Sequence, residues 1–544
     1  MFPGQLYKTE SGRLFHAGAI AIILVGLPAR GKTAISRSLY RYIRWLGVQS
    51  KVFSVGNYRR QIVGVELTND FFSPANKATA DMRLKIANAC LDDMVQWFAQ
   101  GGQVGILDGS NTTAERRQEL VERFKACNVQ PMFIETICDN PAIVDANIRS
   151  VKVSSPDYVG WDRTDAVNDF KRRIANHEPF YTTISDLSLS FVKVINAGER
   201  IMVNNAQGFL QSKIVYYLTN LHISPRTIYF ARNGTSLNEY SYKADAPLAS
   251  GGHRYAENLK NFLLTLRENT PTSSPTSPST PETQQHQQQR PLTVWTSARK
   301  RSFQTAAHFL DHEEIIVRQR SVLAERNPGV CDQMTPEEIE EQYPDEILRA
   351  KADPYRHRFP RAESYYDLAN RLEMVILELE REKNDVLIVA HESVLRCLYG
   401  YLNGLPESEI PSLEIPEGVL LELTPTAYTT EERRHRIPDL IASVNWQQQT
   451  ANVMTLAGNV PASPMYMGQY MTQRDKRSMS SSASTTTTTT PVFSSSTSSL
   501  SSNSSSLTPG LAAAASIAPP SPAITSERHR QIKNEYGQGP ALAV

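Results

Sequence analysis

The chain has little cysteine, no excess of charge of one sign and no long apolar run, and each lack excludes a class of protein. Its five cysteines lie among 544 residues without a CxxC pair, so we expect neither a disulfide framework nor a zinc site. Lys plus Arg number 57 and Asp plus Glu 56, and a formal charge of +1 argues against nucleic acid or an anionic membrane as a partner. No run of about 18 apolar residues predicts a membrane span, and the N-terminus lacks the apolar core of a signal peptide. We therefore expect a cytoplasmic protein.

What is present divides the chain into three parts of different composition. Residues 1–221 and 222–430 both predict an α/β fold, because short apolar strands alternate with amphipathic stretches, a pattern typical of mostly parallel sheets. The expected strands are "AGAIAIILVGL", "SKVFSV", "QVGILDG" and "QPMFIETI" in the first part and "TIYFA", "LTVWTS" and "DVLIVAH" in the second. A Pro/Ser/Thr/Gln-rich insertion at 268–290 and a Ser/Thr-rich tail at 431–544 have too little apolar surface to bury, and we expect both to be disordered.

A phosphate-binding loop follows the first strand. The stretch "GLPARGKT" matches G-x-x-x-x-G-K-[ST] and opens an amphipathic helix that we expect to end at Gly47, which is the context the motif requires. The glycines let backbone N–H groups turn toward phosphate oxygens, the lysine contributes a charge to the β- and γ-phosphates, and the threonine hydroxyl suits Mg²⁺. The motif predicts ATP or GTP as cofactor, bound by Gly26, Leu27, Pro28, Ala29, Arg30, Gly31, Lys32 and Thr33.

An acidic residue and a set of basic residues follow other strands of the first part. Asp108 ends the strand in "VGILDGSNTT", and two roles are open for it: Mg²⁺ coordination or proton acceptance beside the phosphate loop, and capping of the next helix. Forked guanidinium groups suit a sugar phosphate, whereas single arginines on helix surfaces are ordinarily solvated. The basic candidates are Arg59, Arg60, Arg83, Arg116, Arg117, Lys152 and Arg173.

These stretches together resemble the 6-phosphofructo-2-kinase/fructose-2,6-bisphosphatase family. The similarity is carried by "GLPARGKT", "GNYRR", "LDGSNTTAERR", "ICDNP" and "VKVSSPDY" in the first part, and by "VWTSARKRSFQTA", "YRHRFPRAESYYDL" and "AHESVLRCLYGYL" in the second. It runs in order over about residues 4–430. The resemblance implies an N-terminal P-loop kinase domain that moves the ATP γ-phosphoryl group to the 2-hydroxyl of fructose 6-phosphate. A histidine-phosphatase domain of the phosphoglycerate-mutase type would follow it.

The resemblance also implies roles for individual residues. Catalysis would rest on Lys32, Asp108 and Lys152, with Thr33 and Asp108 at Mg²⁺; the nucleotide would contact the phosphate loop, Cys138 and Asn147; and fructose 6-phosphate would contact Arg59, Arg83, Ser110, Arg116 and Lys152. Two departures from the family bear on sugar-phosphate affinity: Asn57 stands where an acidic residue is usual, and His177 where a tyrosine is usual. Self-association in this family would involve the kinase half.

The second part departs from its family at the nucleophile. Histidine phosphatases carry Arg-His-Gly-Glu, whose histidine forms a phosphoenzyme, but this chain has Arg232-Asn233-Gly234-Thr235. An amide nitrogen is delocalised into its carbonyl and is a poor nucleophile, so we expect phosphatase activity to be lost. The remaining, degenerate site is expected at Arg232, Asn233, Asn238, Arg301, Glu325, Arg356 and His391.

Several interpretations stay open from the residues alone. The kinase would make fructose 2,6-bisphosphate, a regulator of glycolysis, while the second part either senses a ligand or has drifted and binds none. A bifunctional enzyme with residual phosphatase activity is the alternative against which Asn233 argues. A P-loop kinase with another small acceptor is disfavoured by the arginines. In the tail, Ser478 follows the basic cluster of "RDKRSMS" and is a candidate target of a regulatory protein kinase.

Overall fold

The structure is a computed structural model of the chain that describes residues 18–65, 67, 69–73, 75–154, 156–158, 160–223, 226–237, 245–269, 290–426 and 430–438. Both predicted α/β parts lie largely within these ranges. Most of the predicted insertion, residues 270–289, lies outside the described residues, and so does the predicted tail from 439 onward, including Ser478.

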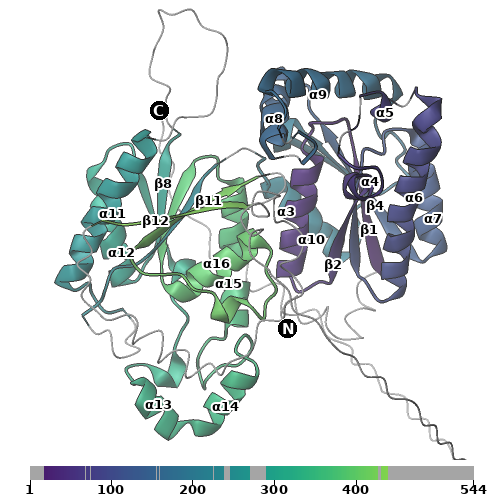
Figure 1. Cartoon of the computed structure of the whole chain (residues 1–544). Helices are drawn as coiled ribbons and strands as arrows, with labels where there is room; N and C mark the ends of the chain where they lie inside the picture. The colour runs from purple at the N-terminus through teal and green to yellow at the C-terminus, as the bar shows by residue number, and fades with distance from the viewer. Residues whose placement is uncertain are drawn as a thin grey trace, which may run out of the picture. The chain divides into compact units, whose positions relative to one another are not determined.

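The first part folds as a six-stranded sheet with helices on both faces (Figure 1). The strand order is β2-β3-β1-β4-β5-β6, and all neighbours are parallel except β6, which runs antiparallel to β5. Near-continuous apolar sequence lets the central strands be covered on both faces, as parallel strands require. The four predicted strands are confirmed, and the sheet consists of β1 (Ala19–Val25), β2 (Ser50–Ser54), β3 (Val104–Asp108), β4 (Val129–Ile137), β5 (Phe191–Ile195) and β6 (Arg200–Asn204).

Two pairs of helices cover this first sheet. Helices α3 (Lys32–Trp45) and α10 (Gly208–Asn220) pack on one face, and α6 (Lys77–Ala99) and α7 (Ala114–Ala126) pack on the other. Helix α3 begins directly after the phosphate loop and ends just before Gly47, whose φ of 78° is left-handed and stops the helix. The remaining helices of this part are α4 (Val55–Val63), α5 (Asn69–Phe72), α8 (Pro141–Ser154) and α9 (Arg163–His177).

The second part holds another six-stranded sheet, in the order β12-β11-β7-β10-β8-β9. Strands β7, β8, β9 and β10 are parallel, and β11 and β12 add an antiparallel edge. The strands are β7 (Ile228–Arg232), β8 (Leu292–Ser297), β9 (Ile316–Arg320), β10 (Asp385–Ala390), β11 (Val419–Pro425) and β12 (Thr430–Arg436), which confirms the three predicted ones.

Helices α11 (Ser250–Asn269) and α12 (Lys300–Ala307) pack on one face of the second sheet, and α15 (Tyr365–Arg381) and α16 (Glu392–Asn403) pack on the other (Figure 1). Two short helices, α13 (Pro336–Gln342) and α14 (Pro344–Ala352), lie on the excursion between β9 and α15. No helix within the described ranges is long and apolar enough to cross a membrane.

Strand β12 continues the second sheet past residue 430, where the sequence analysis placed the start of the tail. Its sequence, "TEERRHR", contains no apolar residue and therefore gave no strand signal. It forms because it is an edge strand. Its backbone pairs with β11, while its charged side chains extend into solvent or contact neighbouring charged side chains. One such contact joins His435 Nε2 and Glu422 Oε2 at 2.6 Å.

The two parts meet at a buried carboxylate. Glu380 on α15 is 3% exposed and accepts hydrogen bonds from Arg41 of α3, from Arg226 in the connection, and from the hydroxyls of Tyr217 and Tyr401, at 2.6–3.3 Å. Burial alone would raise the pKa of Glu380, but the two guanidinium charges and the Tyr401 hydroxyl outweigh it and lower the pKa. The carboxylate is therefore ionised, and the helix that follows the phosphate loop is tied to the second part.

Candidate active site

The phosphate loop is shaped by glycines that other residues could not replace. Gly26 has a φ of 140°, and a Cβ there would lie 2.6 Å from the carbonyl oxygen and hydroxyl of Thr136. Gly31 caps α3 with a φ of 83°, and even Ala29 between them has a positive φ of 58°. Backbone of this kind turns consecutive N–H groups toward one side, which suits phosphate oxygens.

Three functional side chains predicted from the sequence meet beside this loop. Thr33 Oγ1 donates a hydrogen bond to Asp108 Oδ2 at 3.1 Å, and Lys32 Nζ donates to the carbonyl of Leu27 at 2.6 Å. Burial lowers the pKa of Lys32 to about 8, although Asp108 acts in the opposite direction. Burial raises the pKa of Asp108, opposed by Lys32 and by the Thr33 hydroxyl. The carboxylate is thus more basic than an exposed aspartate.

Asp108 does not cap the helix that follows it. The N-cap of α7 is Thr113, whose hydroxyl accepts from the backbone N–H of Arg116 at 3.2 Å. The segment after Asp108 is instead tied to the phosphate loop, because Gly26 N–H donates to the Ser110 carbonyl at 3.0 Å. Of the two roles left open by the sequence, the geometry favours the one beside the phosphates.

The predicted nucleotide residues lie on the neighbouring strand end and helix. Asn147 Nδ2 on α8 donates to the carbonyl of Ala29 at 3.0 Å, which places its amide against the phosphate loop. Cys138 follows β4, is 7% exposed, and has its thiol 3.7 Å from the carbonyl of Asn140; burial raises its pKa. Lys152 also lies on α8, but its side chain is outside what the structure describes.

Two of the basic candidates share one acidic partner that the sequence analysis missed. Asp157 Oδ2 lies 2.6 Å from Arg59 Nη2, and its Oδ1 lies 3.3 Å from Arg60 Nη1. Arg59 is 7% exposed, so its position is fixed, and Asn57 holds Arg60 through a 2.6 Å hydrogen bond. Asp157 gave no signal because it is about 100 residues away in the sequence, in "SSPDY".

The other basic candidates differ in the partners that their guanidinium groups contact. Among the described residues, Arg83 on α6 donates only to neutral oxygens, including the Phe71 carbonyl at 2.9 Å, and burial lowers its pKa. Arg116 pairs with Glu119 at 2.7 Å on the surface of α7. Arg117 is 4% exposed and donates to carbonyls of its own loop and to Thr182, so its role is to hold the loop after Asp108.

His177 stands at the end of α9 near this basic group. Its Nδ1 lies 2.9 Å from the carbonyl of Arg173, so Nδ1 carries the proton and donates. Burial lowers the pKa of His177, and the charges of Lys32, Arg83 and Arg173 lower it further. The ring is therefore neutral at neutral pH and leaves Nε2 as an acceptor.

The degenerate site in the second part gathers where β7, β8 and β10 end side by side. Asn233 follows β7, and its N–H donates to the carbonyl of Ala390 at 3.2 Å, which places it next to His391 at the start of α16. The side chain of Asn233 donates to the carbonyl of Gly234 at 3.3 Å. Adjacent strand ends in a parallel sheet are the usual place for such a site.

His391 is held as a neutral ring in this site. Its Nδ1 accepts from the backbone N–H of Ser393 at 3.3 Å, so the neutral tautomer carries its proton on Nε2, 4.0 Å from Glu325 Oε2. Burial, followed by four surrounding guanidinium groups, holds its pKa well below the usual value.

Glu325 and Arg301 form an ion pair beside His391. Arg371 fixes the loop by donating to the carbonyl of Glu325 at 3.2 Å, so the unusual sequence "RNPG" after Glu325 still leaves the carboxylate beside Arg301 and His391. Burial, with Arg232 and Arg299, lowers the pKa of Arg301 to about 10, which leaves it charged at neutral pH.

The last three predicted residues of this site have different outcomes. Arg232 lies at the strand end and pairs with Glu392 at 3.5 Å and with Glu417 at 2.6 Å. Arg356 makes its ion pairs elsewhere, with Asp353 at 3.7 Å and with Glu407, so these contacts do not join it to the group. Asn238 lies outside the described residues.

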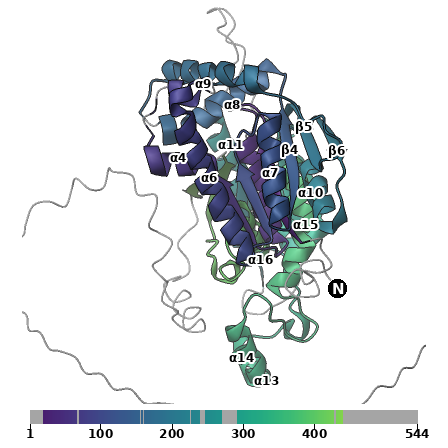
Figure 2. The same ribbon diagram turned by 90° about the vertical axis from the view of Figure 1, so that its right-hand side faces the viewer.

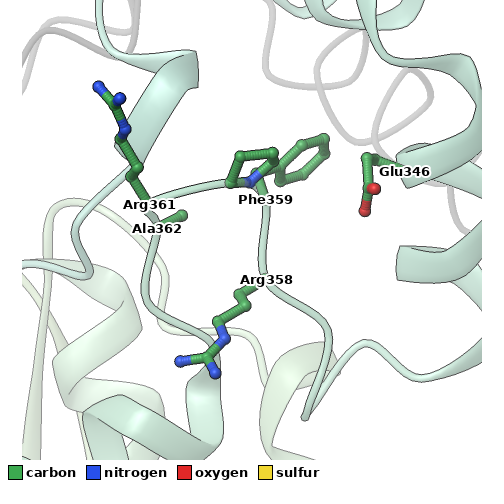
Figure 3. Close-up of a pocket in the computed structure, with 6 residues that line it drawn as sticks. Glu346, Arg358, Phe359, Arg361 and Ala362 are labelled. Carbon is green, nitrogen blue, oxygen red and sulfur yellow. The ribbon is translucent and has the colours of Figure 1, made fainter.

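A cavity of about 290 Å³ in the second part is not a phosphate site. It is lined by Glu346 and by residues 358–362 of the loop before α15. Figure 3 shows that Arg358 and Arg361 extend in different directions from this loop, so they do not converge on one anion. Within the described ranges no group of three or more His, Cys, Asp or Glu is arranged to hold a metal ion, and all five cysteines are free thiols.

Comparison with known proteins agrees with this two-part architecture. Residues 7–225 match the family model described as 6-phosphofructo-2-kinase, and residues 282–437 match that of the histidine phosphatase superfamily (branch 1). The rat protein 6-phosphofructo-2-kinase/fructose-2,6-bisphosphatase 3 is 41% identical over 417 residues, which cover 75% of this chain and 70% of the relative. The human 6-phosphofructo-2-kinase/fructose-2,6-bisphosphatase 1 is 41% identical over 413 residues, covering 75% of this chain and 82% of the relative.

Proposed function

The chain belongs to the 6-phosphofructo-2-kinase/fructose-2,6-bisphosphatase family, and on that premise we propose that it transfers the γ-phosphoryl group of ATP to the 2-hydroxyl of fructose 6-phosphate. The product is fructose 2,6-bisphosphate. The single observation that carries the proposal is the meeting of Lys32, Thr33 and Asp108 beside the phosphate loop. These groups belong to the chemistry of phosphoryl transfer.

Each of these side chains has a task in the transfer. The loop N–H groups hold the β- and γ-phosphates, and Lys32 leaves the Leu27 carbonyl to neutralise charge on the transferring group. Asp108 accepts the proton of the 2-hydroxyl as that oxygen forms its bond to phosphorus and the bond to the ADP oxygen breaks. The oxygens of Thr33 and Asp108, 3.1 Å apart, fit Mg²⁺, which supplies charge neutralisation when bound.

The sugar phosphate is assigned to the basic residues around the same edge of the sheet. Arg59 and Arg83 bind its phosphate. Asp157 already holds Arg59 in place, and the partners of Arg83 among the described residues are neutral oxygens that a phosphate can replace. Ser110, Arg116 and Lys152 complete the contacts that the family implies. A guanidinium group that is already ordered loses little freedom on binding, which favours affinity.

One assay tests the proposed kinase. Purified protein is incubated with MgATP and fructose 6-phosphate, and ³¹P NMR of the product identifies which carbon gains the phosphate. A 2-phosphate is expected. Phosphate at C1, or ATP consumption with no sugar product, would return the chain to the wider group of P-loop kinases.

For the second part, we propose that it does not hydrolyse fructose 2,6-bisphosphate through a phosphoenzyme. Asn233 offers no nucleophilic nitrogen, and His391 keeps its proton on Nε2. With ³²P-labelled fructose 2,6-bisphosphate, no phosphoprotein should be trapped by acid quench. A labelled burst from the unmutated chain would restore the bifunctional alternative.

We also propose that the kinase half self-associates through strand β6. It is the edge strand of the first sheet, as Figure 2 shows, and among the described strands it pairs only with β5. Met202 and Val203 on β6 are 53% and 43% exposed, and an exposed apolar edge strand is a template for pairing with a second copy. Sedimentation should give a dimer that Met202→Asp dissociates; an unchanged dimer would place the contact elsewhere.

Two further proposals concern the setting of the enzyme. Five free thiols support a reducing compartment such as the cytoplasm. We propose that the tail is a regulatory appendage phosphorylated at Ser478, and that deletion of residues 440–544 leaves basal kinase activity intact. Loss of soluble protein on that deletion would show that the tail is needed for folding.

A further inference from the structure

The carboxyl edge of the second sheet holds a set of opposite charges that we call the edge cluster. Its guanidinium groups are Arg232, Arg301, Arg326 and Arg396, and its carboxylates are Glu325, Glu392 and Glu417. Four guanidinium groups alone would attract a phosphate dianion strongly. Here three carboxylates face them and leave a small net charge.

Arg232 is largely engaged by groups of the chain itself. Its Nη2 lies 2.6 Å from Glu417 Oε1, its Nη1 lies 3.5 Å from Glu392 Oε2, and Nη1 also donates to the carbonyl of Ile415 at 3.3 Å. Its side chain is 23% exposed. An incoming phosphate would therefore have to displace carboxylates from a partly buried position rather than occupy free donors.

Glu392 spans two of the guanidinium groups at once. An acid in the first turn of a helix, one turn before an arginine, is ordinary, and Glu392 Oε1 does lie 2.5 Å from Arg396 Nη2. What helix stability does not require is the second contact, from Oε2 to Arg232. A carboxylate whose two oxygens face two guanidinium groups resembles the way a phosphate is held.

Glu325 completes the pattern at the third guanidinium group. It is 8% exposed and pairs with Arg301, so this arginine also has a carboxylate of the chain as its partner. Three of the four guanidinium groups thus have an internal anion within ion-pair distance, and Arg326 lies over the ring of Tyr365 at 4.8 Å.

We propose that Glu392 and Glu417 are built-in counterions that exclude phosphate esters from the edge cluster. The arginines are retained, but their charge is used internally, so the second part binds phosphate weakly in addition to lacking a nucleophile. The inference rests on the proposed assignment of the edge cluster as a former phosphate site. It does not depend on kinase activity, which the product assay measures separately on the same preparation.

Calorimetry on the full chain tests this. Inorganic phosphate is titrated into the unmutated protein, the Glu392→Gln/Glu417→Gln double variant and a Glu414→Gln control, all with saturating MgADP so that the phosphate loop is filled equally. Glu414 is exposed on the same loop as Glu417 and makes no ion pair with the described residues. Removing two like charges next to the anion should tighten binding at least about tenfold in the double variant, and the control should match the unmutated protein.

A further substitution tests whether the tighter phosphate binding occurs at the edge cluster. Adding Arg301→Gln to the double variant should return phosphate binding to the level of the unmutated protein. If the double variant does not fold, Glu417→Gln alone, at a side chain that is 61% exposed, should give a smaller gain in the same direction. Equal affinity in the unmutated protein and the double variant, no binding in either, or the same gain in Glu414→Gln would overturn the proposal.

Discussion

At the residue scale, Lys32 is the side chain whose removal should lower the turnover of the kinase most. The Lys32→Met change keeps the length of the side chain but removes the charge that we propose acts on the transferring phosphoryl group, an interaction worth roughly several kcal/mol. We expect kcat for fructose 2,6-bisphosphate formation to fall by at least about a hundredfold. Lys51→Met, at an exposed lysine of β2, is the control and should keep normal turnover. Near-normal turnover in Lys32→Met would show that Lys32 of the phosphate loop does not take part in phosphoryl transfer.

The same lysine predicts a pH dependence of nucleotide binding. Because burial lowers the pKa of Lys32 to about 8, the free enzyme loses this charge as pH rises through that value. ATP affinity, measured by calorimetry between pH 7 and pH 9.5, should therefore decline above about pH 8. The Lys32→Met variant has no group to titrate there, so its weaker affinity should stay flat; a parallel decline in both proteins would assign the titration to another group.

Asp108 and Thr113 separate chemistry from helix stability. Asp108→Asn removes the proposed proton acceptor but keeps the volume, so kcat should fall about a hundredfold or more while ATP affinity stays near normal. Thr113→Ala removes the cap of α7 and should cost about 1 kcal/mol of stability with little change in kcat. Steady-state kinetics and thermal melts on both variants check this, and the reverse pattern would show that Asp108 is structural.

At the scale of elements, the phosphate loop depends on one close approach. Gly26→Ala would place a Cβ 2.6 Å from two oxygen atoms of Thr136, so the loop must move and ATP affinity should fall at least about tenfold. Gly101→Ala is the matched control: its φ of 95° is also positive, but no atom lies within 4 Å of the new Cβ. Both changes should cost roughly 1 kcal/mol or more of stability, and only the first should raise the KM for ATP. An equal KM for ATP in the two variants would show that this loop does not bind the nucleotide.

How well the sequence predicted each element follows from how local its signal was. The buried strands and the phosphate loop were predictable because apolar runs and a glycine motif are contiguous. Strand β12 was missed since its stability comes from backbone pairing at an edge and its side chains are polar. Asp157, Glu392 and Glu417 were missed because their partners are brought close only by the fold.

At the scale of the whole molecule, Glu380 joins the two α/β parts. Glu380→Gln would leave Arg41 and Arg226 without their countercharge in a buried place, which should cost about 3–5 kcal/mol. Glu378→Gln on the same helix is the control, because its side chain is 41% exposed and its pair with Arg320 should contribute less than about 1 kcal/mol. Equal thermal midpoints for the two variants would show that the contact contributes little.

At acid pH the free energies of unfolding of Glu380→Gln and of the unmutated protein should differ less than at neutral pH. The folded-state pKa of Glu380 is lowered, so its contribution to stability is fully present above the pKa of the unfolded chain, near 4.5. It is lost as pH falls through the folded pKa. Denaturant unfolding should therefore give a large difference in the free energy of unfolding between the two proteins at pH 7 and a smaller one at pH 4 and below. A difference that does not change with pH would show that the hydrogen bonds of Glu380, rather than its charge, stabilise the fold.

The contact at Glu380 also bears on how such a chain can change over generations. A domain that has lost its chemistry, as we propose for the second part, is ordinarily free to be shortened or discarded. Removal of this one would leave Arg41, on the helix that follows the phosphate loop, without its counterion. A domain can therefore lose its catalytic activity and still be retained, because the rest of the chain needs it in order to fold. In a random mutant library selected for kinase activity alone, substitutions should accumulate around Asn233 and be depleted around Glu380, because the second part, inactive in our proposal, still supports the fold of the kinase part.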